Sequence, residues 1–426
     1  MTASAPATFP HLRLRAPTPA LLALPWELPL ADWPESLPFR RIPVGPSRHL
    51  VRFLDVDGTT YALKELPLPV ASREFEVLTH LERLELPAVA PTGIAESPDG
   101  GEAILVTEYL RHSLQYRRLF MRLPLVGGYR DRLLDAMAGL LVELHRNGVY
   151  WGDCSLANTL FRRDGDRIQA YLVDAETSET HPALSDGQRA WDLEILVENV
   201  AFGLADLAAM QGRTGEIEES IAIAEGVGTR YRALWRELTE ETEVAADDRY
   251  AMSARVRRLN ELGFSVDELE LVPSGEGRVR LRVAVTTRRF HARELLGRTG
   301  LHALEGQARL LLNDLREYRA WVERHEGIAL SRSEAARRWL AEVFLPTLER
   351  IEGAIGPHRD RVQAYCDVLE TKWIRSERAR RDVGLAAAIE SYLEQGAPAP
   401  EGSDAGIPSE ETGVIYLDEL DERGLG

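Results

Sequence analysis

The chain has 426 residues, of which 44% are hydrophobic and 28% are charged, which is typical of a globular protein with room for two or three domain cores. Its formal net charge of −17 argues against a protein that binds nucleic acid or acidic membranes through its overall charge. The two cysteines, Cys154 and Cys366, are too few for a disulfide scaffold and wrongly spaced for a structural zinc site, so we expect a cytoplasmic protein.

The two ends of the chain have compositions unlike the rest. Residues 1–38 are rich in proline and alanine and predict an irregular N-terminal arm on the surface of the first domain. Prolines and an acidic residue break the apolar stretch of this arm well short of a spanning helix, so we expect no transmembrane segment. Residues 397–426 are acidic and rich in glycine and proline, which predicts a disordered tail.

A hairpin and a helix are predicted directly after the arm. Residues 49–66 contain two apolar-alternating runs joined at Asp57-Gly58, a strong hairpin signal that puts Lys64 on the second strand. Residues 72–84 then have apolar side chains at helical spacing behind Ser72, which is a candidate N-cap.

A strand, a helix and a polar loop come next. Residues 102–110 have the pattern of a buried strand, and 129–148 predict an amphipathic helix that ends at Asn147-Gly148. His145, in the last turn of that helix, is expected to complement the helix dipole. The polar run GDCSLAN (152–158) follows, and a second buried strand ends at residue 174.

The rest of the chain is mainly helical. Helical spacing runs from residue 185 to beyond 230, residues 264–288 predict a β-hairpin, and 290–396 are helical again. We therefore divide the chain into a first domain over 39–212 and a mainly helical domain with one hairpin over 213–396.

Lysine is almost absent from the chain. Lys64 and Lys372 are the only two lysines, and the other 49 of the 51 Lys and Arg residues are arginine. Arginine presents a broad planar fork, whereas lysine carries a compact charge on a slim stem that suits a narrow pocket for one phosphate oxygen. Two lysines must fall somewhere in any case, so their neighbours decide whether the choice has a function.

The neighbours of Lys64 occur in the order that a nucleotide phosphotransferase requires. Such an enzyme needs a cation on the α- and β-phosphates, a carboxylate that holds this cation, a carboxylate facing the acceptor hydroxyl, and amide and carboxylate oxygens for Mg²⁺. Taken singly, the candidates are an ordinary acid, turn asparagine or strand-end acid, but together they favour a phosphotransfer site. In the same order, the candidates are Lys64 for the cation, Glu74 for the carboxylate that holds it, Asp153 for the carboxylate facing the hydroxyl, and Asn158 with Asp174 for Mg²⁺.

With these motifs, residues 40–200 resemble the protein-kinase-like fold, and in particular its lipopolysaccharide-kinase and small-molecule-kinase branch. The resemblance implies an α+β fold with an antiparallel small-lobe sheet and a helical large lobe, and ATP with Mg²⁺ as cofactors. It assigns the adenine-reading hinge to Glu108, Tyr109 and Leu110, and it makes Asp192 the acid that accepts hydrogen bonds from the catalytic-loop backbone. The wider layout, from YWGDCSLANTLF to KWIRSERARRDVGL, resembles a bacterial family, family 4032, that adds a C-terminal domain of unknown function.

The glycine-rich loop expected from this resemblance is reduced to PVGPSRH (43–49). Gly45 and Ser47 remain as candidates for phosphate binding, and Arg48 or His49 can substitute for the missing glycines. Because this loop has few glycines, the sequence also allows a protein that is not an enzyme. Such a protein would be a non-catalytic ATP-binding adaptor whose C-terminal domain docks a partner.

The segment after the last motif indicates the class of acceptor. Only seventeen residues separate Asp174 from Asp192, which leaves little chain of the kind on which protein kinases seat a peptide. We therefore expect the hydroxyl acceptor to be a small molecule, a glycan or a lipid more than a protein.

The C-terminal domain contains a second group of basic residues. Arg278, Arg280 and Arg282 lie on one face of the predicted hairpin, which indicates either a solvated charged face or an anion site for a phosphorylated ligand or nucleic-acid backbone. Lys372 is either an ordinary surface lysine or a contact for phosphate or a partner. Further basic side chains follow the hairpin, namely Arg288, Arg289, His291 and Arg293.

Overall fold

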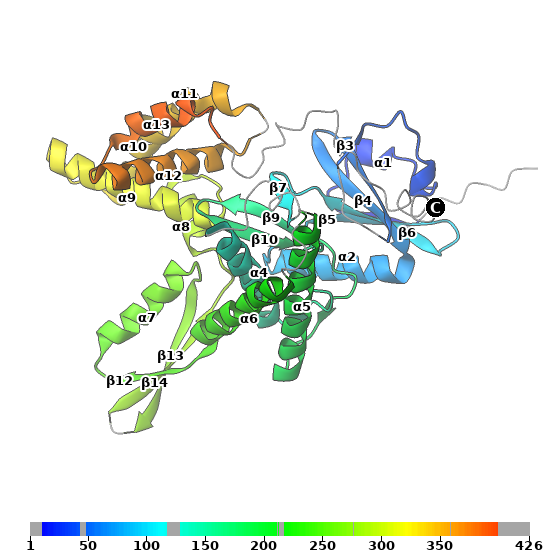
Figure 1. The fold of residues 1–426 in the computed structure, drawn as a ribbon, viewed down its shortest axis with the longest axis horizontal. Helices are drawn as coiled ribbons and strands as arrows, with labels where there is room; N and C mark the ends of the chain where they lie inside the picture. Colours follow the sequence, from blue (N-terminus) through cyan, green and yellow to red (C-terminus); the bar gives the residue numbers. More distant parts are fainter. Residues whose placement is uncertain are drawn as a thin grey trace, which may run out of the picture.

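A computed structural model of the chain describes residues 11–42, 48–116, 128–210, 212, 217–275, 277–357 and 359–398. Figure 1 shows a small lobe with a sheet, a helical large lobe beside it, and C-terminal helices and a long hairpin on the far side of the large lobe. The predicted α+β fold, with an antiparallel small-lobe sheet and a mainly helical C-terminal domain, is confirmed.

The small lobe contains an antiparallel six-stranded sheet in the order β1-β5-β6-β4-β3-β2. The predicted hairpin is the β3–β4 pair, which turns at Asp57 and Gly58 with positive φ at both residues, and Lys64 lies on β4 as expected. The strands are β1 (Leu12–Leu14), β2 (Phe39–Arg40), β3 (Leu50–Val56), β4 (Thr59–Pro67), β5 (Pro91–Glu96) and β6 (Glu102–Glu108).

The helix α2 (Leu68–Arg83) covers one face of this sheet and buries Phe75 and Leu78 against it. The prediction that Ser72 caps this helix is wrong, because the helix begins one turn earlier. Pro69 lies in its first turn, where a missing N–H costs nothing, and Ser72 lies inside the helix.

The N-terminal arm covers the other face of the sheet and is more ordered than predicted. Its first described residues form β1, and it continues with α1 (Pro19–Leu22) and a 3₁₀ turn, η1 (Leu30–Asp32). Trp26 and Trp33 are buried with a ring-centroid separation of 5.3 Å, and they pack against the strand residues Leu54 and Leu63. The prolines that suggested irregular chain interrupt the arm, but its aromatic and leucine side chains fasten it to the sheet.

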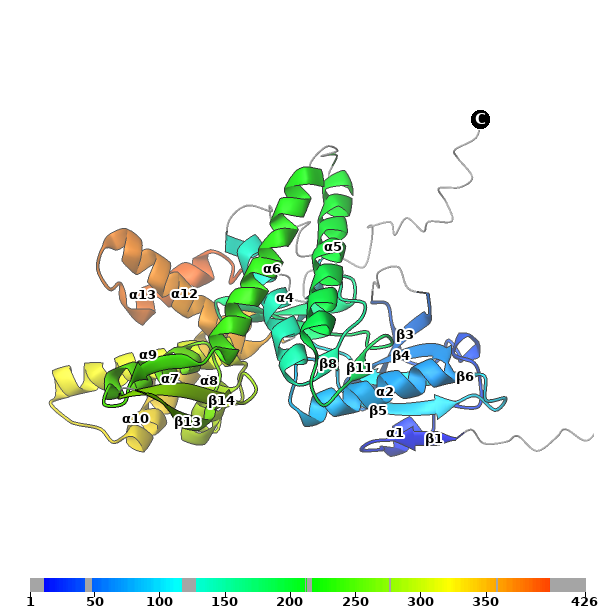
Figure 2. The ribbon, with the colours of Figure 1, turned by 90° about the horizontal axis from the view of Figure 1, so that it is seen from below.

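The large lobe packs three long helices against short strands. Figure 2 shows α5 and α6 side by side as an antiparallel pair that extends from the lobe. The elements are β7 (Ser113–Gln115), α4 (Gly128–Arg146), β8 (Val149–Tyr150), β9 (Thr159–Asp164), β10 (Arg167–Leu172), β11 (Glu179–Thr180), α5 (Asp186–Met210) and α6 (Ile217–Thr239).

The predicted domain boundary after residue 212 coincides with the end of α5 but does not divide the core. Helix α6 buries Ala224, Val227 and Tyr231 in the same core as α4 and α5, and this core continues to Phe264. Apolar spacing alone located the helices and not the partners against which they pack. On packing, the second core begins at Leu295.

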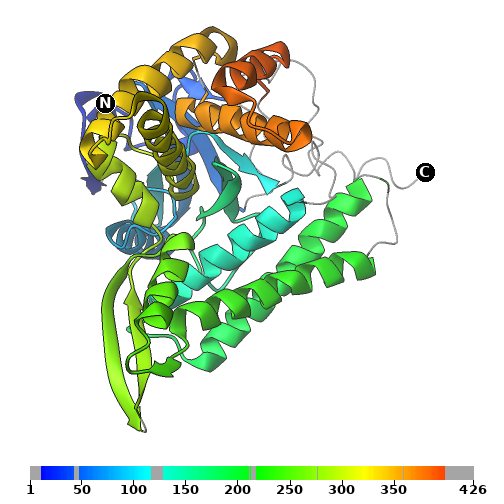
Figure 3. The same cartoon turned by 90° about the vertical axis from the view of Figure 1, so that its left-hand side faces the viewer.

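The C-terminal part begins with a three-stranded sheet in the order β12-β14-β13, so the predicted hairpin gains a third strand. Figure 3 shows this sheet as an arm that projects from the body of the molecule. Its elements are β12 (Thr242–Ala245), α7 (Arg249–Glu261), β13 (Val266–Gly275) and β14 (Arg278–Val285). The helices that follow are α8 (Phe290–Thr299), α9 (Glu305–Glu326), α10 (Arg332–Trp339), the π-helical segment η2 (Leu340–Phe344), α11 (Leu345–Ile355), α12 (Arg361–Ala379) and α13 (Gly384–Glu394).

The C-terminal helices contact the large lobe at the turn between β9 and β10. The Asp164 carboxylate accepts hydrogen bonds from the backbone N–H groups of Gly306 and Gln307, both at 2.8 Å, and so caps α9. The backbone of Gly165 exchanges two hydrogen bonds with the Gln363 side chain of α12, at 2.9 and 3.0 Å. A Cβ atom on Gly306 would lie 2.2 Å from the Asp164 carbonyl oxygen, so this approach requires glycine.

Gly306→Ala should therefore weaken the contact between α9 and the β9–β10 turn. Overpacking a filled contact costs on the order of 1 to 3 kcal/mol, so we expect the free energy of unfolding, measured by denaturant titration, to fall by that amount. The matched control is Gly353→Ala on α11, where an added Cβ meets no atom within 4 Å. Alanine should leave the stability of the control equal or raise it by about 1 kcal/mol. Equal stability of the two variants would contradict the proposed role of Gly306.

Candidate active site

Lys64 joins the two lobes. Its ammonium nitrogen lies 3.0 Å from Glu74 Oε2 on α2 and 2.9 Å from Asp174 Oδ2, which directly follows β10 and Val173 in the large lobe. The three side chains are 14%, 1% and 26% exposed, so the pair formed within the small lobe is almost fully shielded from water. The expected convergence of Lys64, Glu74 and Asp174 is therefore present in the structure.

The electrostatics of this group favour a charged lysine. Burial opposes the charge on Lys64, but the carboxylates of Glu74 and Asp174 outweigh it and raise the pKa of the ammonium. Burial, together with the nearby charge of Asp174, raises the pKa of Glu74 to about 7, although Lys64 opposes the shift. The ammonium is therefore shared by two carboxyl groups, one from each lobe.

Glu176 is a member of this group that the sequence did not reveal. Its Oε2 atom is buried and makes no hydrogen bond in the part of the chain that the structure describes. The same atom lies 3.7 Å from Lys64 Nζ and 3.3 Å from His49 Nε2. Glu176 stands two residues after Asp174, where the kinase pattern has glycine, so no family motif pointed to it; His49 was expected near phosphate as a substitute for the thin loop.

The polar loop GDCSLAN brings Asp153 and Asn158 together. The Asn158 amide nitrogen donates to the Asp153 backbone oxygen at 3.1 Å and to Asp153 Oδ2 at 2.9 Å. The Asn158 carbonyl oxygen of the backbone accepts from Val173 N at 3.1 Å, which places this loop beside the strand end that carries Asp174. Since its amide nitrogen is used on Asp153, the side-chain oxygen of Asn158 is left available for a metal ion.

A buried carboxylate, Asp192 on α5, fixes the backbone of this loop. Asp192 Oδ2 accepts from Trp151 N at 2.8 Å and lies 2.9 Å from His145 Nε2, while Oδ1 accepts from Gly152 N at 2.8 Å and from the Cys154 thiol at 3.1 Å. Although burial opposes it, these hydrogen bonds lower the pKa of Asp192. The contacts implied for Asp192 by the kinase resemblance are therefore present.

His145 lies in the last turn of α4 as expected, but its surroundings differ from the expected ones. Its side chain is fully buried between Asp192 and the Tyr231 hydroxyl, which lies 2.7 Å from Nδ1. Burial lowers the pKa of the imidazole, so the ring is not the charged partner of a helix dipole. The sequence located His145 at a helix end but could not show that α6 and α5 enclose it there.

The proposed hinge residues lie where the small lobe meets the large lobe. Glu108 ends β6 and its backbone N–H donates to Ala90 O at 2.8 Å, Tyr109 N donates to Thr60 O at 2.9 Å, and Leu110 packs against the large-lobe core. Gly45 and Ser47 lie outside the described residues. No group of three or more His, Cys, Asp and Glu side chains with metal-binding geometry occurs in the described ranges.

The basic residues of the C-terminal hairpin are matched by acids. Arg282 pairs with Glu241 at 2.7 Å and with Glu270 at 3.2 Å, and Arg280 and Arg278 pair with glutamates of β12 or of the residue before it at 3.4 and 3.5 Å. This arrangement fits the solvated charged face and not an anion site on the hairpin.

Lys372, the second lysine, belongs to no comparable group. Its ammonium lies 3.2 Å from Glu317 Oε2 and 4.0 Å from Asp382 Oδ2, and both acids are more than two-thirds exposed. The Lys372 side chain is itself only 19% exposed, but both of its acid partners face solvent, unlike the buried Glu74 beside Lys64.

Two family models match the chain, one in each of its two parts. The model of the lipopolysaccharide kinase (Kdo/WaaP) family matches residues 56–211, and the model of a domain of unknown function, DUF4032, matches residues 233–396. The resemblance drawn from the sequence is confirmed by both matches, which together give the expected two-part arrangement. No curated protein is significantly similar to the chain.

A solved structure with similarity to the chain is described as WaaP in complex with acyl carrier protein. It is 19% identical, with a TM-score of 0.32, and the match covers 51% of this chain and 87% of the solved chain. Within the described residues, none of the helices combines the length and the apolar composition that a membrane crossing requires.

Asp192→Asn should loosen the loop that carries Asp153. The new amide group would point two N–H donors at groups that are themselves donors, and unpaired buried donors cost about 1 to 3 kcal/mol. We expect a loss of that size in the free energy of unfolding from denaturant titration. Asp186→Asn is the matched control, because Asp186 begins the same helix, is 96% exposed and pairs only with Arg189. The control should lose less than about 1 kcal/mol; an equal loss in both variants would contradict this account of Asp192.

The raised pKa of Glu74 predicts a pH-dependent stability. The folded protein holds the Glu74 proton up to a pKa of about 7, whereas the unfolded chain releases it near 4.5, so this group stabilises the fold less as the pH rises through that window. Glu74→Gln has no such titration. The stability of the wild type relative to this variant should fall by about 1 to 3 kcal/mol between pH 4.5 and 7 and stay level above it. Denaturant titrations across pH 4.5 to 8 measure the difference in the free energy of unfolding between the two proteins. A difference that grows in favour of the wild type as the pH rises would contradict the prediction.

Proposed function

We propose that the chain is an ATP- and Mg²⁺-dependent phosphotransferase that acts on a hydroxyl group of a sugar, glycan or other small molecule or lipid. The observation that carries this proposal is the position of the Lys64 ammonium between Glu74 and Asp174, at 3.0 and 2.9 Å. A lysine held by a helix carboxylate in one lobe and facing a strand-end acid in the other is the arrangement with which protein kinases transfer a phosphoryl group. The match to the lipopolysaccharide kinase family supports the same class of reaction.

In this proposal each residue of the cleft has one task. Lys64, held by Glu74, binds the α- and β-phosphates, and Asp153 orients the acceptor hydroxyl and receives its proton. The hydrogen bond from Asn158 to Asp153 at 2.9 Å keeps that carboxylate in place. Bound ATP supplies the phosphoryl group, and Mg²⁺ neutralises the charge that develops on it. Positioning and electrostatic stabilisation carry most of the rate in such a site.

The donor set of the cleft fits a divalent cation. Asp174 and the side-chain oxygen of Asn158 are hard oxygen ligands, as Mg²⁺ prefers. Glu176 adds a buried carboxylate oxygen without a hydrogen bond, which is a costly arrangement unless a cation or a cationic side chain balances it. We assign Asn158 and Asp174 to the metal, and Glu108, Tyr109 and Leu110 to the adenine, with Gly45 and Ser47 as further phosphate contacts.

The segment between Asp174 and α5 supports a small acceptor. Thr177 and Ser178 donate to the Trp151 carbonyl oxygen at 2.9 and 3.2 Å, and β11 pairs with β8 next to the polar loop. This segment is therefore fastened to the catalytic loop and presents no long strand-like surface for a peptide. A cytoplasmic location belongs to the same proposal, and the two free, buried cysteines are compatible with it.

The two lysines provide a matched test of this function. Lys64→Arg keeps the charge but places a wide, planar group between Glu74 and Asp174, so we expect turnover of ATP with Mg²⁺ to fall at least about 100-fold. Lys372→Arg, the same substitution at the only other lysine, should leave turnover within about twofold of wild type. The measurement is ATP consumption by purified full-length protein with a panel of sugar and lipid acceptors, and Asp153→Asn serves as the second inactive variant.

The same measurement separates an enzyme from a nucleotide-binding adaptor. If the wild type binds ATP with Mg²⁺ but neither it nor the variants consume ATP with any acceptor, the adaptor is favoured and the phosphotransferase is not. If Lys64→Arg and Lys372→Arg retain equal turnover, Lys64 does not hold the phosphates.

A further inference from the structure

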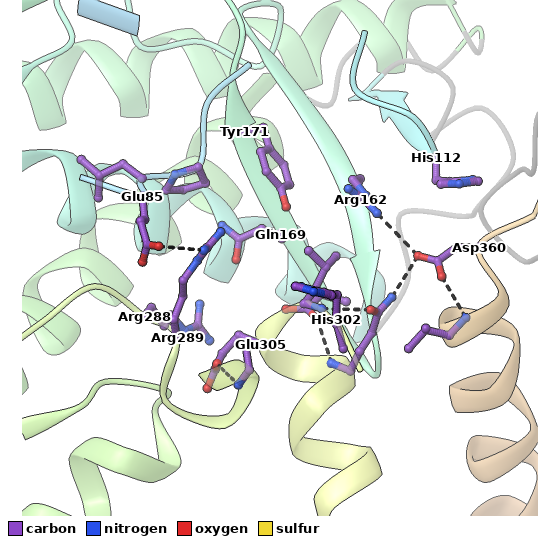
Figure 4. A pocket seen from close by; sticks show the side chains of 18 of the residues that line it. Glu85, His112, Arg162, Gln169, Tyr171, Arg288, Arg289, His302, Glu305 and Asp360 are labelled. Carbon is purple, nitrogen blue, oxygen red and sulfur yellow. Dashed lines mark hydrogen bonds and ion pairs between the residues drawn. The ribbon is translucent and has the colours of Figure 1, made fainter. Parts of the chain in front are cut away.

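A large cavity lies between the large lobe and the C-terminal helices, away from the cleft that holds Lys64. Its volume is about 1070 Å³, at the upper end of the range of small-molecule sites. One wall is the outer face of β9 and β10, and the other is formed by the ends of α8, α9 and α12 (Figure 4). The side chains of Arg162, Gln169 and Tyr171 project into it from the strands, and His302 lies opposite them.

Several hydrogen-bond donors in this cavity have unused capacity. Among the described residues, the buried Nε–H of Arg162 has no hydrogen-bond partner, and the acid that pairs with this arginine, Asp360, lies 3.5 Å away. Arg288 donates its Nε–H to the Leu262 carbonyl oxygen at 2.9 Å but forms no ion pair with a described residue. His302 forms neither a hydrogen bond nor an ion pair with the described residues. Arg289 and Arg293 share a single carboxylate, that of Glu85.

The acids that line the cavity are already occupied by other contacts. Asp360 accepts from the backbone N–H groups of Val362 and Gln363 at the start of α12, both at 3.0 Å. Glu305 and Asp164 bind the first amides of α8 and α9 in the same way, and Glu82 pairs with Arg15. Acids and arginines are equal in number in the lining, and most of the arginines also have an acid partner: Arg359 pairs with Asp367 and Arg361 with Glu352. Arg288 is the arginine of the lining that forms no ion pair with a described residue, and Arg162 has only the long contact to Asp360.

The remaining acid of the lining, Glu143, is also held by a backbone N–H group, that of Arg288. Glu143 faces the cavity from α4, and burial raises its pKa to about 7 although Arg288 and Arg146 oppose the shift. A carboxyl group that is only partly ionised at neutral pH leaves the guanidinium of Arg288 without a full counter-charge.

We propose that this interdomain cavity is a binding site for a small soluble molecule that carries a phosphate group. Guanidinium groups, an imidazole and a phenol hydroxyl directed at one space are donors that match the acceptor-rich oxygens of a phosphate ester, and Arg162 and Arg288 approach it from the two walls. The Gln169 and Tyr171 side chains stand beside Arg162 on the neighbouring strand, and they supply further polar contacts for the organic part.

The site lies next to the elements that carry the proposed catalytic groups. Strand β9 begins directly after Asn158, and β10 ends two residues before Asp174, so the wall of the cavity is the hairpin that joins them. The cavity also reaches Ala90, whose carbonyl oxygen accepts from Glu108 N in the proposed hinge. A ligand there contacts both walls and so stabilises the contact of the C-terminal helices with the large lobe.

The test is calorimetric titration of the full-length protein, without nucleotide, with glucose 6-phosphate and with inorganic phosphate. Arg288→Gln and Arg162→Gln should each weaken binding at least about tenfold, because each removes a charged hydrogen-bond donor. Arg337→Gln, a 79% exposed arginine on α10, is the control and should bind like the wild type. Lys64→Met should also bind like the wild type, which separates this site from phosphate binding in the active-site cleft.

Each other outcome overturns the proposal. Binding that is lost in Lys64→Met and kept in Arg288→Gln places the phosphate in the cleft. Binding only to vesicles of phosphatidylglycerol and phosphatidylcholine, and to neither soluble probe, assigns the phosphate to a lipid headgroup. Binding that is seen only after removal of residues 399–426 means that the acidic end of the chain, and not a phosphate, is the natural occupant of the cavity. The carbonyl oxygens of Ala397 and Pro398, just before this segment, accept hydrogen bonds from Arg359. Equal binding by all the arginine variants, or no binding by the folded wild type, also excludes the site.

Discussion

One ammonium group between carboxylates from two lobes is the interaction on which the rest of the site depends. Lys64 comes from β4 and Glu74 from α2, so their pair fixes the helix against the small-lobe sheet. Asp174 comes from the large lobe, so its contact with the same nitrogen sets the distance between the lobes. Glu74 Oε1 also accepts from Ala175 N at 3.3 Å, which ties the helix directly to the strand end. The charges of Lys64, Glu74 and Asp174 therefore determine how the two lobes meet at the cleft.

The second constraint is the carboxylate of Asp192. Backbone N–H groups in a tight loop need acceptors, and the loop that carries Asp153 receives them from outside the loop. Asp192 supplies them from a long helix, and Gly152, with φ of 83°, allows the turn that aims two consecutive N–H groups at it. The pair with His145 extends this support to α4 and, through Tyr231, to α6. The loop is thus held by three helices, and one of them lies beyond the region that the kinase-family model matches.

The sequence located the candidate site residues better than the residues that surround them. Lys64, Glu74, Asp153, Asn158 and Asp174 could be selected because the proposed phosphoryl transfer calls for their chemistry in a fixed order, and the structure places Lys64 beside Glu74 and Asp174, and Asn158 beside Asp153. Glu176 and Tyr231 could not, since a surface acid and a core tyrosine have the same pattern in a sequence as these two. The arm was predicted as irregular because prolines interrupt it, yet Trp26 and Trp33 bury it; local breaks in pattern do not report burial by long-range packing. The packing of α6 was missed for the same reason, because periodicity finds a helix but not the core that it joins.

The contact between the two parts of the chain gives the C-terminal helices a structural role in the site. Asn158 and Asp174 stand at the two ends of the β9–β10 hairpin, and the turn of that hairpin is bonded to α9 and α12 through Asp164 and Gly165. Arg163 adds buried ion pairs to Asp367 and Glu370, at 2.5 and 3.1 Å. The turn of this hairpin is therefore held by helices outside the large lobe, and the position of the two strands that end next to both proposed metal ligands depends on these helices.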